Sequence, residues 1–380
     1  MSQLESKTLF DSLGHIEDPR SEHLTQHKLI DILVIAICAT ICGADGWEQI
    51  ATCGRAKQEW FKQFLELPHG IPSPDTFARV FQLIKPTVFQ QVFMHWVSAA
   101  VEKSGGDLVN IDGKQLRGTR KKKKYQADGQ EGLRMVSAWA ARNRVVLGQV
   151  KTAEKSNEIT AIPKLLELLE LKGCIVTIDA MGCQTAIVEQ IVKKEADYVL
   201  SLKGNQGTLH TDIEEYFAWA TSEKFKDIEY DFCKSLEKGH GRIEERICYV
   251  TEDVEWLEHK ADWVGLKSII MVEAKREVIG MEPTVERRYF ISSLAVTARQ
   301  AIKAVRGHWK VENQLHWCLD VGFREDACRI RAGHSAENLA VLRHIALNLL
   351  KQEKSCKLGI ASKRMQAGWD NGYLSKVLNI

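Results

Sequence analysis

The sequence predicts an α/β protein with a mixed sheet, preceded by an all-helical domain. Residues 1–105 show only helical periodicity, whereas residues 106–224 alternate strand-like apolar runs with amphipathic helices. Two of the strand-like runs end in the same Ile-Asp pair. Three strands precede the first crossover helix, and strands and helices then alternate, so we expect antiparallel pairing first and parallel pairing afterwards.

Four stretches justify the helical domain. We predict a buried helix from "LIDILVIAICATICG", an amphipathic helix from "RAKQEWFKQFLEL", and a third helix from "SPDTFARVFQLI". The third has a start signal at Ser73 or Asp75, beside Pro74. A fourth, "PTVFQQVFMHWVSAAVEKSGG", ends at Gly105 and Gly106, which we take as a domain boundary.

The α/β domain follows in the order strand, strand, strand, helix, strand, helix, strand. The predicted strands are "DLVNIDG", "LRMVSAWAA", "RVVLGQVKT", "CIVTID" and "DYVLSLKG". The second and third join at Arg142 and Asn143. The helices are "IPKLLELLELKG", with Pro163 near its first turn and Gly173 past its end, and "TAIVEQIVKKEA".

A strand-rich segment then interrupts this domain before its last helix. Residues 225–294 contain "RIEERICYV", "SIIMVEAKREV" and "VERRYFISSL". The last helix opens at Thr297 with a capping box to Gln300, and "AENLAVLRHIALNLLKQE" forms a final amphipathic helix. We therefore divide the chain into a helical N-terminal domain, an α/β core, a β-rich insertion and a C-terminal segment, which span residues 1–105, residues 106–224 with 295–355, residues 225–294 and residues 356–380.

Composition is that of a soluble globular protein. The chain has 380 residues, of which 44% are hydrophobic and 27% charged, and its net charge is +2, so a nucleic-acid surface requires local clustering of cations. Ten cysteines without a CxxC pair argue against a zinc ribbon. We find no signal peptide, and the longest apolar run, from Leu29 to Cys42, is too short for a bilayer. We expect a cytoplasmic protein.

The two Ile-Asp endings place Asp112 and Asp179 after buried strands. Ligands bind open α/β sheets at strand ends, so on adjacent strands the two carboxylates converge. Close carboxylates repel, and a divalent cation with hard oxygen ligands, Mg²⁺ or Mn²⁺, removes that conflict. The alternative is that each aspartate merely caps a turn.

A polar stripe on the late helix offers a third acid. His308, Glu312, His316 and Asp320 follow one another at four-residue steps, which keeps them on one helical face. A zinc site from His308, Glu312 and His316 is an alternative, although the two histidines lie more than two turns apart. A stripe that only meets solvent, with Trp309 and Trp317 packed inward, is the second alternative.

The motifs resemble those of bacterial insertion-sequence transposases of the DDE type, in the branch that includes the H-repeat-associated proteins. The matching stretches cover almost the whole chain: "NIDGKQLRG", "KSNEITAIPKLLELL", "IVTIDAMGCQ", "DYVLSLKGNQG", "HGRIEER", "RYFISSL", "HWKVENQLHWCLDVGFRED" and "NLAVLRHIALNLL". The resemblance implies an RNase H-like catalytic core with a β-rich insertion between the second acid and the third. It also implies the catalytic, metal-holding triad Asp112, Asp179 and Glu312.

The residues around Glu312 depart from the family pattern. Related transposases carry a Tyr and an Arg before the glutamate and a Lys or Arg after it. Here Arg306 precedes Glu312, Val305 or Trp309 stands nearest to the place of the Tyr, and Arg324 is the first basic residue afterwards. Glu325 and Asp326 are rivals for the third ligand position.

The resemblance implies a transposition mechanism with two Mg²⁺ or Mn²⁺ ions. Two such ions, held roughly 3.5–4 Å apart, would activate the nucleophile and stabilise the leaving 3′ oxygen. Water cuts the element end and leaves a 3′-OH, which then attacks target DNA. We expect DNA as the partner (element ends and target), no membrane, a homodimer on paired ends, and a nucleoid location.

The DNA surface has its own signal in "RGTRKKKKY", six basic residues within eight, directly after the first acid. The candidate DNA contacts are Lys114, Arg117, Arg120, Lys121, Lys122, Lys123 and Lys124 near Asp112, and Lys203, Arg242 and Arg306 by resemblance. A solvated basic loop is the alternative for this run, and a solvated turn lysine for Lys114. "SPDTFARVFQLI" is the candidate for recognition of element ends, with plain packing as its alternative.

Two other functions remain open on the sequence alone. A degenerate copy would bind DNA without cutting it, although all three acids are present. A glycoside hydrolase would use Asp112 and Asp179 without a metal and needs sugar-stacking aromatics, for which only Trp139 is near in the sequence.

Overall fold

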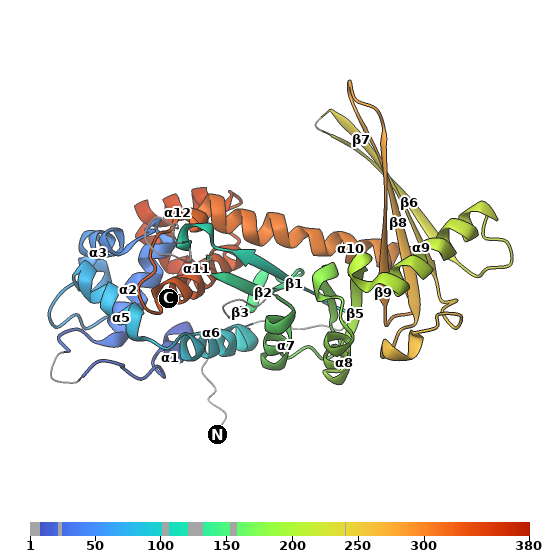
Figure 1. Cartoon of the computed structure of the whole chain (residues 1–380). Coiled ribbons are helices and arrows are strands. Elements are labelled where there is room, and N and C mark those ends of the chain that lie inside the picture. The colour runs from blue at the N-terminus through green and yellow to red at the C-terminus, as the bar shows by residue number, and fades with distance from the viewer. Residues whose placement is uncertain (1–7, 22–24, 101–105, 121–131, 153–157, 240) are drawn as a thin grey trace. The chain divides into compact units, whose positions relative to one another are not determined.

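The computed structural model of the chain describes residues 8–21, 25–100, 106–120, 132–152, 158–239 and 241–380 (Figure 1). The fold divides into two compact units. The first contains Met1–Glu102, Gly113–Thr152 and Glu312–Ile380, and the second contains Lys103–Asp112 and Ala153–Val311. The helices in the described part of the chain are all too short or too polar to span a lipid bilayer.

In the described residues, the first unit begins with six helices, of which the sequence predicts several at different bounds and does not predict α1. They are α1 (Leu9–Leu13), α2 (Leu29–Ile41), α3 (Trp47–Ala56), α4 (Gln58–Phe61), α5 (Pro74–Leu83) and α6 (Pro86–Ala100). Helix α2 is buried along nearly its whole length. The prediction of one helix over "RAKQEWFKQFLEL" is wrong, because α3 ends at Ala56 and α4 starts only at Gln58. Lys57, between the two helices, donates a hydrogen bond from its side chain to Asn371 Oδ1 at 2.6 Å. Ser73 is the cap of α5 and accepts from Thr76 N–H.

The remainder of the first unit joins a hairpin to three C-terminal helices. Strands β2 (Arg134–Ala140) and β3 (Val145–Lys151) pair antiparallel, and the helices are α11 (Ser335–Gln352), α12 (Ile360–Trp369) and α13 (Asn371–Leu378). Helix α11 is buried on almost every side. The side-chain amide of its Asn338 donates to the carbonyls of Phe81 and Ile84, at 2.8 and 2.9 Å, and so caps the end of α5.

One mixed sheet holds all nine strands of the described residues, in the order β3-β2-β1-β4-β5-β9-β8-β7-β6. The other strands are β1 (Leu108–Gln115), β4 (Ile175–Ile178), β5 (Asp197–Leu202), β6 (Asp231–Gly239), β7 (Arg242–Thr251), β8 (Ser268–Val278) and β9 (Thr284–Ser292). Strand β4 pairs parallel with both β1 and β5. The pairs β5–β9, β9–β8, β8–β7 and β7–β6 are antiparallel. The expected mixed sheet is thus confirmed.

The β-rich segment extends the same sheet and does not form a separate one. Strand β9 pairs with β5, from Val199 opposite Ser292 to Leu202 opposite Tyr289. The sequence pattern does not predict β6, because the side chains of this strand are mostly exposed and lack the alternation of a half-buried strand. In Figure 1, strands β6 to β9 form the long ribbon at the end of the sheet.

Helices cover both faces of the sheet in the second unit. They are α7 (Glu158–Leu168), α8 (Thr185–Lys193), α9 (Gly207–Ser222), which the sequence analysis missed, and α10 (Ala298–Val311). Side chains of α10, among them Ala301 and Val305, form one core with Val199 of β5 and with β7, β8 and β9. Because side chains alternate along a strand, Tyr198 and Leu200 face the other side, where α7 and α8 lie (Figure 1).

Two details of these helices differ from the prediction. Helix α7 starts at Glu158, so Pro163 lies inside it and not near its first turn. Helix α10 does have the expected capping box, in which Thr297 N–H donates to Gln300 Oε1 at 3.0 Å and Gln300 N–H donates to Thr297 Oγ1 at 3.3 Å. It then continues as π-helix over Glu312–His316 and Cys318–Gly322.

Candidate active site

Two aspartates follow paired residues on neighbouring parallel strands. The β1–β4 register runs from Leu108 opposite Ile175 to Ile111 opposite Ile178, so the next residues are Asp112 and Asp179. Strand β4 ends at Ile178, whereas β1 continues to Gln115, so Asp112 does not close its strand as the sequence suggested. Both side chains are half-buried. The strand pairing therefore brings the two carboxylates to the same edge of the sheet.

A tight turn fixes the second aspartate. Asp179 caps the short helix Ala180–Gly182, and its Oδ1 accepts from Met181 N–H at 3.1 Å and Gly182 N–H at 3.3 Å. A Cβ on Gly182 would lie 2.3 Å from Ile178 Cγ2, so this position requires glycine. The capping alternative is thus present in the structure, and it orients the carboxylate without removing it from the sheet edge.

Two amides that the sequence analysis did not single out support this turn. Asn205 Nδ2 donates to the carbonyl of Ala180 at 2.8 Å, and Gln206 Nε2 donates to the carbonyl of Cys183 at 2.7 Å. Both belong to "KGNQG", directly after β5. These contacts are possible because β5 lies next to β4 in the sheet. In the sequence, the only indication of them is that both amides directly follow the strand after Asp179.

The polar stripe of the late helix divides between different partners. His308 Nδ1 lies 3.1 Å from Thr177 Oγ1, two residues before Asp179. His316 is buried, whereas Glu312 is exposed. The stripe does not stay on one face, since the π-helix from Glu312 onward advances by more residues per turn than the α-helix before it.

A group of candidate metal ligands contains the third acid. Glu312 and His316, both of the first unit, each offer one ligand atom, and these two atoms lie within 4.8 Å of each other. Neither Asp179 nor His308 is in this group. A carboxylate oxygen suits Mg²⁺ or Mn²⁺ and an imidazole nitrogen suits Zn²⁺ or Fe²⁺, so these donors can bind a divalent cation without selecting one.

Lys114 is part of a buried charge network in the first unit. Its ammonium pairs with Asp320 and, at 2.9 Å, with Glu325, whose other oxygen lies 3.6 Å from Arg343. Burial would raise the pKa of the Glu325 carboxyl, but Lys114 and Arg343 outweigh it and hold that pKa below its usual range. Burial would likewise lower the pKa of Lys114, and the carboxylates hold it above its usual value.

Glu325 and Asp326, the rivals of Glu312 for the third ligand position, both form ion pairs within the first unit. Glu325 is only 2% exposed and neutralises two cations, and Asp326 pairs with Arg117 at 3.5 Å. Both acids therefore have a structural partner of their own. Lys114 is half-buried with two carboxylates on its ammonium, which favours a structural role over contact with a phosphate.

Comparison with known proteins decides the family. The family model described as the transposase DDE domain matches residues 103–349, and the one described as DDE_Tnp_1-associated matches residues 10–97. The chain belongs to the DDE transposase family. Together the two matches cover most of the chain, including Asp112, Asp179 and Glu312.

Relatives of the transposase match it end to end. "H repeat-associated putative transposase YhhI" of Escherichia coli K12 is 40% identical over 380 residues, which are 99% of this chain and 98% of the relative. "Putative transposase YncI" of Escherichia coli O157:H7 is 41% identical over 376 residues, 98% of this chain and 94% of the relative. The resemblance that the motifs indicate is confirmed, and the protein is an insertion-sequence transposase of the DDE type.

A solved structure shows a weaker likeness. The piggyBac transposase synaptic complex with hairpin DNA, determined by cryo-electron microscopy, is 9% identical in sequence. It aligns with a TM-score of 0.45 over 99% of this chain and 82% of that one. A score below 0.5 does not assign a fold.

The remaining candidate DNA contacts of the transposase are mostly exposed. Arg117, Arg120, Lys203 and Arg242 lie at the surface, the last at the start of β7. Arg306 pairs with Glu237 of β6. The four lysines of the basic run, Lys121, Lys122, Lys123 and Lys124, lie outside the described residues.

Proposed function

We propose that the transposase cuts DNA at the ends of its element and joins the freed ends to target DNA, with Asp112, Asp179 and Glu312 as its catalytic acids. The observation that carries this proposal is the parallel β1–β4 register, which puts Asp112 and Asp179 at one edge of the sheet. Strands β1, β4 and β5, with β2 and β3 antiparallel beside them and helices on both faces, support an RNase H-like core.

The three acids would hold two divalent cations, Mg²⁺ or Mn²⁺. When bound, such ions supply Lewis acidity and neutralise charge at the scissile phosphate. The chain contributes the positions: the hydrogen bonds from Met181 and Gly182 fix one carboxylate, and the middle of β1 fixes another. The negative charges of the three carboxylates would also repel DNA phosphate until cations bind.

The reaction has two balanced displacements at phosphorus. In the first, a water oxygen bonds to the phosphorus, the bond to the 3′ oxygen breaks, and the water proton leaves to solvent while the 3′ oxygen is protonated. In the second, the oxygen of that 3′-OH bonds to the phosphorus of a target phosphodiester and its proton leaves to solvent, while the bond to the target's own 3′ oxygen breaks and that oxygen is protonated. A homodimer on paired ends would bring two such 3′-OH groups to one target.

The decisive experiment compares Asp179→Asn with the wild type in a nicking assay. The substrate is an oligonucleotide that carries the element ends, with Mg²⁺ present. We expect the variant to fall below about one hundredth of the wild-type rate, because a single charge-stabilising group is worth about 10²–10³-fold. Asp262→Asn, at an exposed aspartate of the same unit, is the matched control and should nick normally. Equal rates for Asp179→Asn and wild type would overturn the proposal.

The two alternatives predict other results. A degenerate copy would bind the oligonucleotide but nick it in neither form. A glycoside hydrolase would act on sugars in the presence of EDTA. Trp139 speaks against the latter, since its ring is fully buried in β2 and offers no face to a sugar.

A further inference from the structure

Two segments far apart in the sequence pack together in the first unit. The carbonyl of Gly118 accepts two bonds from Arg331, from Nε at 3.2 Å and from Nη2 at 2.7 Å. The backbone N–H of Arg117 donates to Asp326 Oδ1 at 3.3 Å. Residues 117–120, the start of the basic run, therefore lie against residues 324–331.

Gly118 sets the closeness of this packing. A Cβ at this position would lie 2.2 Å from the carbonyl oxygen of Cys328 and 2.7 Å from that of Asp326. Both are backbone atoms, so neither can swing aside. A glycine is required for the two segments to touch, and the sequence alone gives no reason for it.

The packing concentrates positive charge on one surface. Five arginines on the two segments are exposed: Arg117, Arg120, Arg324, Arg329 and Arg331. We call them the arginine face. On the same segments the acids are Glu325, which is buried against Lys114 and Arg343, and Asp326, which pairs with Arg117. Four guanidinium groups thus remain without a carboxylate partner among the described residues.

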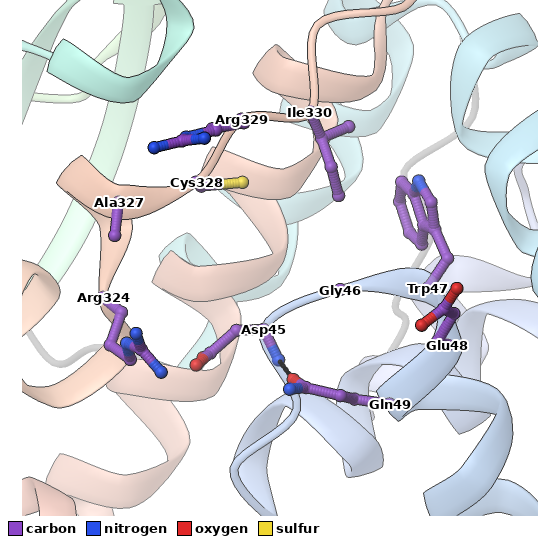
Figure 2. Close-up of a pocket in the computed structure, with 10 residues that line it drawn as sticks. All are labelled: Asp45, Gly46, Trp47, Glu48, Gln49, Arg324, Ala327, Cys328, Arg329 and Ile330. Atoms are coloured by element: carbon purple, nitrogen blue, oxygen red, sulfur yellow. Dashed lines mark hydrogen bonds between the residues drawn. The ribbon is translucent and has the colours of Figure 1, made fainter.

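One side of the arginine face borders a pocket of about 490 Å³. Figure 2 shows Arg324 and Arg329 on one side of it and Trp47 with Glu48 across from them. Glu48 is exposed, and the other acid of the lining, Asp45, pairs with Arg364 at 3.2 Å. Arg324 has left-handed backbone angles, φ 50° and ψ 37°. The chain changes direction at this residue, between the π-helix Cys318–Gly322 and the rest of the segment 324–331.

We propose that the arginine face binds the phosphodiester backbone of duplex DNA without reading its sequence. This deepens the proposed function and rests on it for the identity of the partner. Guanidinium is always charged and offers paired donors that match the oxygens of a phosphate. Strand β1 ends at Gln115, so the segment 117–120 begins only five residues along the chain after the proposed catalytic acid Asp112. Arg324, Arg329 and Arg331 join the predicted contacts Arg117 and Arg120.

The test measures binding of a 30-base-pair duplex of arbitrary sequence in EDTA, over a series of salt concentrations. Each phosphate contact contributes about −0.9 to the slope of log K against log salt. We expect Arg324→Gln with Arg329→Gln to make the slope shallower by about 2. The charge-preserving Arg324→Lys with Arg329→Lys should keep most of the slope. Thermal melting of each variant confirms that it is folded.

Controls separate this proposal from a general charge effect. Arg55→Gln with Lys357→Gln removes two exposed cations of the same unit that belong to neither segment, and should leave the slope unchanged. Gly118→Ala should weaken binding with no change in charge, since it forces the two segments apart. The proposal is wrong if the double glutamine variant keeps the wild-type slope, or if it loses binding to polyglutamate and not to the duplex.

Failure here and failure of the proposed function look different. A shallower slope together with unimpaired nicking by Asp179→Asn would keep the arginine face and overturn the catalytic proposal. An unchanged slope together with loss of nicking in Asp179→Asn would do the reverse.

Discussion

At the scale of single residues, the site depends on how Asp179 is held. Its carboxylate is oriented by two backbone N–H groups of a turn that a glycine makes possible. Asn205 and Gln206 then tie the turn to the loop after the next strand. A carboxylate at a strand end is visible in a sequence, because the apolar run stops there. Amides that bond to a backbone carbonyl of another loop are not, because their partners depend on the fold.

Gly182→Ala tests this arrangement. The new Cβ would meet Ile178 Cγ2, a branched side chain in the core, so the turn must shift. We expect a loss of about 1–3 kcal/mol in the free energy of unfolding. Because a displacement of about 1 Å can cost about 10²-fold in rate, nicking should fall by about that factor. Gly239→Ala, where nothing lies within 4 Å of the new Cβ, is the control. Wild-type nicking by a stably folded Gly182→Ala would show that the turn does not position the acid.

His344 gives the buried charge network a pH dependence. The side chain is 2% exposed, and burial lowers the pKa of its imidazole to about 4. The unfolded chain takes up this proton near pH 6.5 and the folded chain only near 4, so the stabilisation is complete above pH 6.5 and is lost as the pH falls to 4. At about 1.4 kcal/mol per pKa unit, the loss approaches about 3 kcal/mol.

Urea unfolding between pH 7 and pH 4 measures this loss. His344→Gln should show a weaker fall of stability with decreasing pH than the wild type. His334→Gln, at an exposed histidine of the same unit, should follow the wild type. Parallel curves for the wild type and His344→Gln would mean that this imidazole does not govern the acid sensitivity.

At the scale of elements, helix α11 completes the hydrogen bonding of β3. Strand β3 is the last strand on its side of the sheet. Asn348 of α11 lies beside it, accepts from Val146 N–H at 2.8 Å and donates to the carbonyl of Val146 at 2.9 Å. One side-chain amide thus replaces the missing neighbouring strand at this residue, on a sheet edge where unpaired backbone groups could pair with another chain.

Asn348→Leu tests the role of this contact. The variant leaves a buried donor and a buried acceptor of Val146 without partners, and each costs about 1–3 kcal/mol. We expect the free energy of unfolding to fall by about 2–4 kcal/mol. Gln352→Leu, at an exposed position near the end of the same helix, is the matched control. A loss below about 0.5 kcal/mol for Asn348→Leu would contradict the role that we assign to it.

Element prediction succeeded for several elements with buried apolar side chains, although it missed α9, which has a buried face. Strands β1 to β5 and helix α11 have clear apolar periods, and α10 has its capping box. It failed for β6, which has no buried side chain, and for the π-helix, which the apolar period of the sequence does not indicate. A constant α-helical period predicts one face for the stripe from His308 to Asp320. The change to a π-helix at Glu312 shifts the later residues of the stripe away from that face.

At the scale of the whole molecule, the proposed catalytic acids and the arginine face have opposite electrostatic effects on DNA. The proposed catalytic acids Asp112, Asp179 and Glu312 would repel DNA phosphate unless cations neutralise them, whereas the arginine face would attract phosphate without any metal. Length and net charge could not show this division, since the charges nearly cancel over the chain and separate only after folding. The sequence could place the two aspartates directly after apolar runs, but it could not bring residues 324–331 to the basic run.

Removal of metal separates the two contributions. In EDTA we expect nicking to disappear while duplex binding persists, and added Mg²⁺ or Mn²⁺ should restore nicking. Asp112→Asn with Asp179→Asn should bind the duplex somewhat more tightly than the wild type in EDTA, because two negative charges near the DNA are gone. Anisotropy titrations and nicking assays on the same preparations measure both effects. Nicking that continues in EDTA, or binding that vanishes there, would mean that cutting and holding DNA do not divide between the acids and the arginine face.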